Sequence, residues 1–156
     1  MILENLAKPT LDAVAVLFRY FWKRPRLRMF CGWGHEPNEN KIGNHLVLWI
    51  KIANPTTESI YFERLDVRKS NGDYFLPSIN GIEVGDPIYP SANAVVRIPC
   101  GHVCSQDITS VRVYDALENI HELKGKRLKK SIAELMAEKE RLEGLGFSVH
   151  PSNPYP

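Results

Sequence analysis

The octapeptide HLVLWIKI, residues 45–52, decides the fold class of this chain. Its apolar residues recur with period two, which puts Leu46, Leu48, Ile50 and Ile52 on one side of an extended backbone. A β-strand points successive side chains to opposite faces, so the pattern predicts a strand with one buried face. LRMFCGW (27–33) has the same alternation, and the polar, breaker-rich stretch GHEPNENKIGN (34–44) predicts a loop between them.

Further strands follow towards the C-terminus. SIYFERLDVRK (59–69) alternates, skips one position and resumes, which indicates a bulge, and SNGD (70–73) predicts a type I′ hairpin turn. The Gly- and Pro-rich stretch 78–93 predicts one edge strand, and the remaining strands are expected at AVVRIP (94–99), DITSVRVYD (107–115) and NIHELKG (119–125). The chain is therefore expected to be mainly β, an antiparallel β-sandwich of seven or eight strands.

Helical periodicity flanks this β region. TLDAVAVLFRYFWK (10–23) repeats apolar residues at helical spacing and ends at Pro25, which predicts an amphipathic helix. A C-terminal helix is expected over 126–146, opened by a capping box at Ser131 and Glu134 or beginning earlier, near Lys126. Its predicted apolar face, which we expect to lie against the sandwich, is Leu128, Ile132, Leu135, Met136 and Leu142. The predicted organisation is a helix and basic junction (1–26), a sandwich (27–125), a helix (126–146) and an extended Pro-rich tail (147–156).

Charge is distributed unevenly along the chain. Residues 19–28 and 124–130 each carry five Lys or Arg and no acid, whereas residues 29–123 carry seven basic and twelve acidic residues. The central part is therefore net negative and its two flanks are positive. Such asymmetry favours association with an acidic partner through the basic flanks. If the number of antiparallel strands is even, both flanks are expected at the same end of the sandwich.

The segments KRPRLRMF, LVLWIKIANPTTESIYFERLDV, IYPSANAVVRIP and ITSVRVYDALENIHEL together resemble a loose group of uncharacterised bacterial proteins. In that group an N-terminal apolar helix meets an immunoglobulin-like sandwich through a basic R/K-P-x-L junction. The resemblance covers about residues 11–124 and implies an immunoglobulin-like fold and a cytosolic orientation, without implying an activity. This chain differs from the group because its apolar stretch, interrupted by Asp12 and Arg19, is too short and polar to span a bilayer.

Motifs that carry chemistry are scarce. The sequence has no G-x-S-x-G elbow, H-E-x-x-H pair, P-loop or dinucleotide fingerprint. Its five histidines are scattered, although one could meet Asp107, Asp115 or Glu122 in the fold. We therefore expect no enzymatic activity and no cofactor.

The cysteines allow one alternative. Cys100, His102 and Cys104 have soft ligand atoms that suit zinc and would share one side of an extended chain, so a metal-binding or hydrolytic protein is the alternative function. The spacing lacks the tight-turn geometry of zinc knuckles, so the favoured interpretation is buried, reduced cysteines without metal. Three cysteines, an odd number, also favour a reducing, cytoplasmic compartment.

The sequence thus favours a non-enzymatic binding module that docks through its basic helical end, in a bacterial or phage accessory system as the resemblance implies. The expected occupant is a protein partner, a second copy of the chain or the anionic inner face of a membrane, and nucleic acid ranks third. The predicted apolar anchor is Phe18, Phe21 and Trp22. The predicted contacts to the anionic partner are Lys23, Arg24, Arg26, Arg28, Lys126, Arg127, Lys129 and Lys130.

Overall fold

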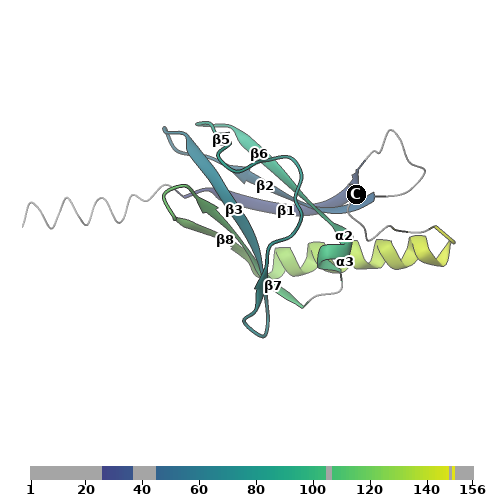
Figure 1. Ribbon diagram of the computed structural model, residues 1–156. Coiled ribbons are helices and arrows are strands. Elements are labelled where there is room, and N and C mark those ends of the chain that lie inside the picture. Colours follow the sequence, from purple (N-terminus) through teal and green to yellow (C-terminus); the bar gives the residue numbers. More distant parts are fainter. Residues whose placement is uncertain (1–25, 37–44, 105–106, 148, 150–156) are drawn as a thin grey trace, which may run out of the picture.

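The computed structural model describes residues 26–36, 45–104, 107–147 and 149, and it contains two antiparallel sheets and a long C-terminal helix (Figure 1). The first sheet has the order β1-β2-β6, formed by Arg28–Glu36, His45–Ala53 and Asn93–Pro99. The second has the order β4-β3-β7-β8, formed by Tyr74–Phe75, Ile60–Lys69, Ile108–Asp115 and Ile120–Lys124, and β5 (Pro87–Ile88) also pairs with β3. The predicted mainly β architecture with antiparallel sheets is confirmed, and the described residues contain eight strands.

The octapeptide at 45–52 forms the centre of the first sheet. Leu46, Leu48, Ile50 and Ile52 are all buried, and β2 pairs with both β1 and β6. In the β1–β2 register Cys31 lies opposite Ile50 and Trp33 opposite Leu48, so these side chains share the inner face. A strand with partners on both sides and one fully buried face is strongly specified in register, because a one-residue slip would expose the whole apolar set.

The predicted bulge lies in β3. The pairing of β3 with β7 shifts between Phe62 and Arg64, after which Leu65 pairs with Val113 and Val67 with Val111. The extra residue keeps Phe62 and Leu65 on the same buried face although they are three positions apart. The interruption of the alternating pattern in the sequence therefore marks a bulge that keeps the buried face of β3 continuous.

The hairpin at 70–73 is confirmed, but its type is not I′. The N–H of Gly72 donates to the carbonyl of Lys69 (3.1 Å), and the N–H of Lys69 donates to the carbonyl of Asp73 (2.9 Å). Gly72 has φ +91° and Asn71 has no positive φ, whereas a type I′ turn needs positive φ at both central residues. The loop has one more residue than a type I′ hairpin has. It is a type I turn followed by Gly72 in the left-handed conformation.

The C-terminal helix α3 spans Lys126–Gly144 and contacts β1, β2, β7 and β8. Its N-cap is Gly125, whose φ of 91° and ψ of −160° suit only glycine, so the predicted start near Lys126 is confirmed and the capping box is wrong. Ser131 lies inside the helix, buried, with its Oγ 3.6 Å from Sγ of Cys31. Met136 is 37% exposed, so the buried face includes Ser131 in place of Met136.

The remaining parts of the predicted organisation are described only in part. Of the N-terminal helix and basic junction the structure describes Arg26, which is exposed, and of the tail it describes residues 147 and 149, with Val149 buried in the core. Within the described ranges, no helix combines the length and apolarity needed to cross a bilayer.

Candidate functional site

The predicted basic residues that the structure describes occupy two places in the sequence. Arg26 and Arg28 precede and open β1, and the others lie on the first two turns of α3. All six are exposed, and we call them the basic surface: Arg26, Arg28, Lys126, Arg127, Lys129 and Lys130. The predicted anchor and contact residues Phe18, Phe21, Trp22, Lys23 and Arg24 lie outside the described residues.

The fold brings these two groups of cations close together. The backbone N–H of Leu27, between Arg26 and Arg28, donates to Nδ1 of His121 on β8 (3.1 Å), and β8 leads directly into α3. Further along β1, the guanidinium carbon of Arg127 lies 5.9 Å from the ring centroid of Phe30, which is 39% exposed. The start of β1 therefore lies beside the start of α3, and the two cationic segments share one region of the molecule.

Most of these cations have no acidic partner. Lys130 lies 3.8 Å from Glu134, but in the part of the chain that the structure describes no carboxylate pairs with the other five. Four other arginines, Arg68, Arg97, Arg112 and Arg141, have carboxylate partners. Nε of Arg112, for example, lies 2.9 Å from Oε1 of Glu122, and this hydrogen bond holds the pKa of Glu122 below its usual range. The basic surface is therefore an uncompensated positive region.

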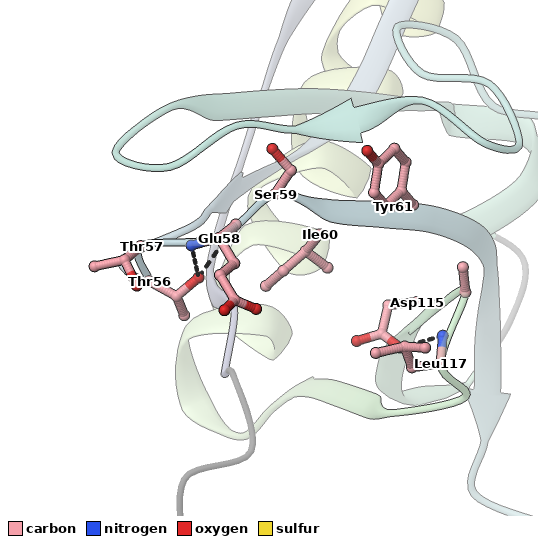
Figure 2. A pocket seen from close by; sticks show the side chains of 9 residues that line it. Thr56, Thr57, Glu58, Ser59, Ile60, Tyr61, Asp115 and Leu117 are labelled. Carbon is pink, nitrogen blue, oxygen red and sulfur yellow. Dashed lines mark hydrogen bonds between the residues drawn. The ribbon is translucent and has the colours of Figure 1, made fainter.

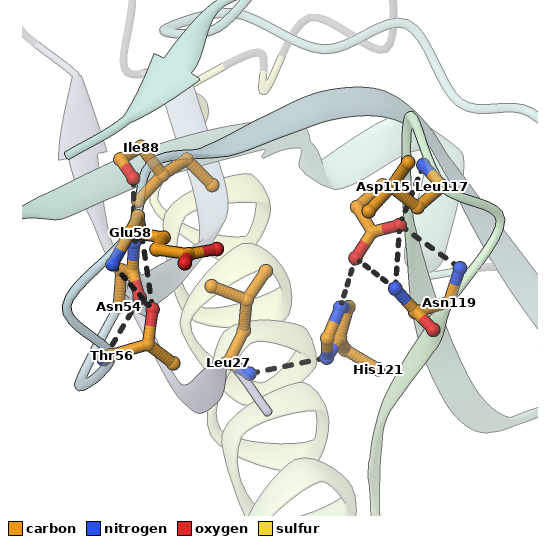
Figure 3. A network of polar contacts seen from close by, with 9 residues as sticks. All are labelled: Leu27, Asn54, Thr56, Glu58, Ile88, Asp115, Leu117, Asn119 and His121. Atoms are coloured by element: carbon orange, nitrogen blue, oxygen red, sulfur yellow. Dashed lines mark hydrogen bonds and ion pairs between the residues drawn. The ribbon is translucent and has the colours of Figure 1, made fainter. Parts of the chain in front are cut away.

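A buried polar network connects β8 with the turn that follows β7 (Figure 3). Nε2 of His121 lies 3.1 Å from Oδ2 of Asp115, and both side chains are almost fully buried. Asp115 Oδ1 also accepts hydrogen bonds from the backbone N–H groups of Leu117 and Asn119 (both 2.9 Å). Because Nδ1 of His121 accepts from Leu27, the ring proton is on Nε2 and is donated to Asp115.

This histidine and aspartate are a structural pair. Burial alone would raise the pKa of Asp115, but hydrogen bonds from Asn119, His121 and Leu117 outweigh it and hold the pKa below its usual value. Both ring nitrogens of His121 are already bonded, so neither is free to take a proton from a substrate. From the sequence, Asp115 was one of three possible acidic partners for a histidine. Only the fold shows that its partner is His121.

A hollow of about 480 Å³ lies next to this network, between the β2–β3 connection and the β7–β8 turn (Figure 2). It is lined by residues 56–61 and 115–117. Ile60, Ala116 and Leu117 supply apolar surface, and the hydroxyl of Thr56 hydrogen-bonds to Asn54 and to the backbone of Glu58. We name this cavity the entry hollow, because Leu27, near the start of the described chain, is connected through His121 to Asp115, which lines the hollow (Figure 3).

Sequence reasoning missed the entry hollow. Its local signal is the Asn-Pro-Thr stretch at 54–56, where Oδ1 of Asn54 accepts the backbone N–H of Thr56 (3.0 Å) in an Asx turn. Nδ2 of Asn54 donates to the carbonyls of Glu58 (2.8 Å) and Ile88 (2.7 Å) and so fixes the connection. The facing wall comes from residues about 60 positions away, which no local pattern reveals.

The structure corrects the interpretation of the Cys-x-His-x-Cys stretch. Residues Cys100–Val103 form one helical turn, α2, rather than an extended chain, and Cys100 and Cys104 are joined as a disulfide. Their sulfurs are therefore not thiolate ligands, nor are they the reduced cysteines that were expected, and Nδ1 of His102 accepts the N–H of Ser78 (3.3 Å). Within the described ranges no three His, Cys, Asp or Glu side chains are grouped to hold a metal, and Cys31 is a buried free thiol.

Comparisons of this chain with protein-family models, with curated proteins and with solved structures find no match, so its function is inferred from its own residues.

Proposed function

We propose that this chain is an immunoglobulin-like docking module, which binds an anionic lipid surface through its basic surface and catalyses no reaction. The strand order supports the fold assignment. If β1, β2, β3, β6, β7 and β8 are taken as strands A, B, C, E, F and G, the two sheets have the orders A-B-E and C-F-G, the division typical of immunoglobulin-like sandwiches.

The observation that carries the docking function is the set of unpaired, exposed cations at the meeting of β1 and α3. Each Lys or Arg near an anionic membrane surface contributes about 1 kcal/mol, so the five unpaired cations contribute about 5 kcal/mol. Such binding is weak and reversible by itself, and a second apolar contact would make it stable.

Lipid is favoured over an acidic protein because of what adjoins the basic surface. Phe30 is exposed beside Arg127, and the chain that precedes Arg26 carries Phe18, Phe21 and Trp22 next to Lys23 and Arg24. Aromatic rings settle at the level of the lipid head groups, and long basic side chains reach the phosphates. This combination supports a peripheral position on an anionic membrane face.

Flotation with lipid vesicles tests the proposal. The full chain is mixed with vesicles of neutral lipid alone or of neutral lipid with 30% anionic lipid, a proportion chosen to be about that of an anionic leaflet. We expect flotation only with the anionic vesicles, and release as salt screens the charges. Lys126→Ala with Lys129→Ala should weaken binding roughly thirtyfold, because two contributions of about 1 kcal/mol are lost.

The matched control is Lys139→Ala with Arg141→Ala, which removes two positive charges from the same helix. These two side chains are already paired with Glu143 and Glu138 and lie outside the basic surface. The control should bind almost as well as the native chain. Equal losses in both double variants would show only a net-charge effect, and failure to float even at low salt would overturn the lipid proposal in favour of an acidic protein partner.

A further inference from the structure

The entry hollow has apolar walls that the described residues leave open to solvent. Leu117, at the tip of the β7–β8 turn, is 79% exposed, and the side chain of Ile60 lies across the hollow from it (Figure 2). The N–H of Ala116 donates to the carbonyl of Tyr61 (2.9 Å), so the two walls are held at a fixed separation. A preformed apolar cavity of this size is a binding site for a few large side chains.

The polar groups of the hollow show which charge the occupant carries. The carboxylate of Asp115 is fully used inside the fold, by His121, Asn119 and Leu117. The carboxylate of Glu58, in contrast, is exposed at the rim and has no hydrogen-bond or ion-pair partner among the described residues. An apolar cavity with a free acid at its rim fits aromatic side chains followed by a cation.

Chain connectivity supplies such a segment. Two hydrogen bonds of 3.1 Å and one imidazole ring separate the backbone nitrogen of Leu27 from the carboxylate of Asp115, which lines the hollow. Trp22 precedes Leu27 by five residues, and five residues of fully extended chain span at most about 18 Å. Trp22 is followed at once by Lys23 and Arg24. A tether this short gives an effective concentration in the millimolar range.

We propose that the entry hollow is the docking site for the aromatic segment 18–22 of the same chain. Phe18, Phe21 and Trp22 supply the side chains that cover Ile60 and Leu117, and Lys23 or Arg24 pairs with Glu58. The proposal stands on the hollow and the tether and does not depend on what the basic surface binds. Its consequence rests on the proposed function: the hollow and a bilayer compete for the same aromatic side chains, so docking restrains membrane binding until an anionic surface is met.

Chemical cross-linking of the full chain tests this docking. Tyr20→Cys leaves the three aromatic anchors in place, and Thr57→Cys puts an exposed thiol at the rim of the hollow. A short bismaleimide should join them within one molecule, because docking brings the two introduced thiols together. The native cysteines should compete little, since Cys31 is buried and Cys100 and Cys104 are joined as a disulfide. The matched control is Tyr20→Cys with Ile120→Cys: Ile120 is 54% exposed and adjoins His121, so the tether is similar, but it does not line the hollow.

The expected result is a several-fold higher intramolecular yield for position 57 than for position 120. Adding Leu117→Asp to the first pair should remove that excess, whereas Leu76→Asp, also at an exposed leucine, should not. Equal intramolecular cross-linking yields at positions 57 and 120 would show that segment 18–22 is not held in the hollow, and would overturn the proposal. Cross-links only between molecules would also overturn it, in favour of docking by a second copy. None of these outcomes depends on lipid, so failure of flotation and failure of docking are distinguishable.

Discussion

The network around Asp115 and the basic surface lie close together and use their charges in opposite ways. Asp115 and His121 are buried and every polar atom of the pair has a partner, whereas five of the six cations nearby are exposed and have none among the described residues. The His–Asp pair is the more familiar sign of catalysis, but its hydrogen bonds hold Leu27 and the β7–β8 turn in place. Unpaired charge, rather than the presence of titratable residues, is therefore the basis on which the basic surface is proposed as the binding surface.

The largest expected effect comes from breaking the buried network. Asp115→Ala leaves the Nε2 proton of His121 and the N–H groups of Leu117 and Asn119 without their acceptor, and should lower the free energy of unfolding by about 3 kcal/mol. Urea denaturation measures this loss. Glu122→Ala removes a partner from an exposed pair and should cost under about 1 kcal/mol. Similar losses for the two variants would contradict the distinction between the regions.

A medium effect is expected where Trp49 crosses the outer face of the first sheet. A Cβ on Gly32 would lie within van der Waals overlap of the Trp49 ring, whose Nε1 donates to the carbonyl of Trp33 (3.2 Å). Gly32→Ala should therefore displace the ring and cost about 1–2 kcal/mol. Gly34→Ala is the control, because a Cβ added at Gly34 would lie 3.9 Å from the nearest atom of Trp49, an ordinary van der Waals distance. Equal melting temperatures for the two variants would mean that the packing of Trp49 on Gly32 does not contribute to stability.

The stability of the fold at acid pH depends on the buried carboxylate of Asp115. The pKa of Asp115 is lower in the folded chain than its ordinary value of 3.8, so its hydrogen bonds stabilise the fold above about pH 4 and lose that contribution as pH falls through the folded pKa. Stability of the native chain should decline more steeply below pH 4 than that of Asp115→Asn, which has no titrating group there. Parallel pH profiles in urea denaturation would show that Asp115 does not couple to folding.

The smallest stability effect is expected at the basic surface. Arg28→Ala or Lys129→Ala should change the free energy of unfolding by no more than about 0.5 kcal/mol, since each side chain is exposed and has no ion-pair partner among the described residues. The same substitutions should each weaken vesicle binding about fivefold. A destabilisation as large as that of Asp115→Ala would mean that these cations support the fold.

How much could be predicted from the sequence differed between elements. Period-two alternation located the long strands and the bulge in β3, because a half-buried strand leaves its periodicity in the residues themselves. Of the two predicted starts of α3, the one near Lys126 is confirmed. The capping box failed because Ser131 packs on Cys31, 100 residues earlier in the chain. The helical turn at Cys100 was missed because four residues are too few to show a period. The gap between the strands predicted at 107–115 and 119–125 indicated a connection there, but not its role as a wall of the entry hollow.

The sequence by itself determined where the long strands and the C-terminal helix lie and where charge is concentrated, because periodicity and charge can be read from consecutive residues. Only the tertiary structure decided that Arg127 lies over the ring of Phe30, that His121 accepts a hydrogen bond from Leu27 across 94 positions, and that residues 56–61 and 115–117 line one hollow. These contacts depend on strand order and sheet packing. The burial that sets strand order is summed over the whole core, so no local stretch of sequence specifies it.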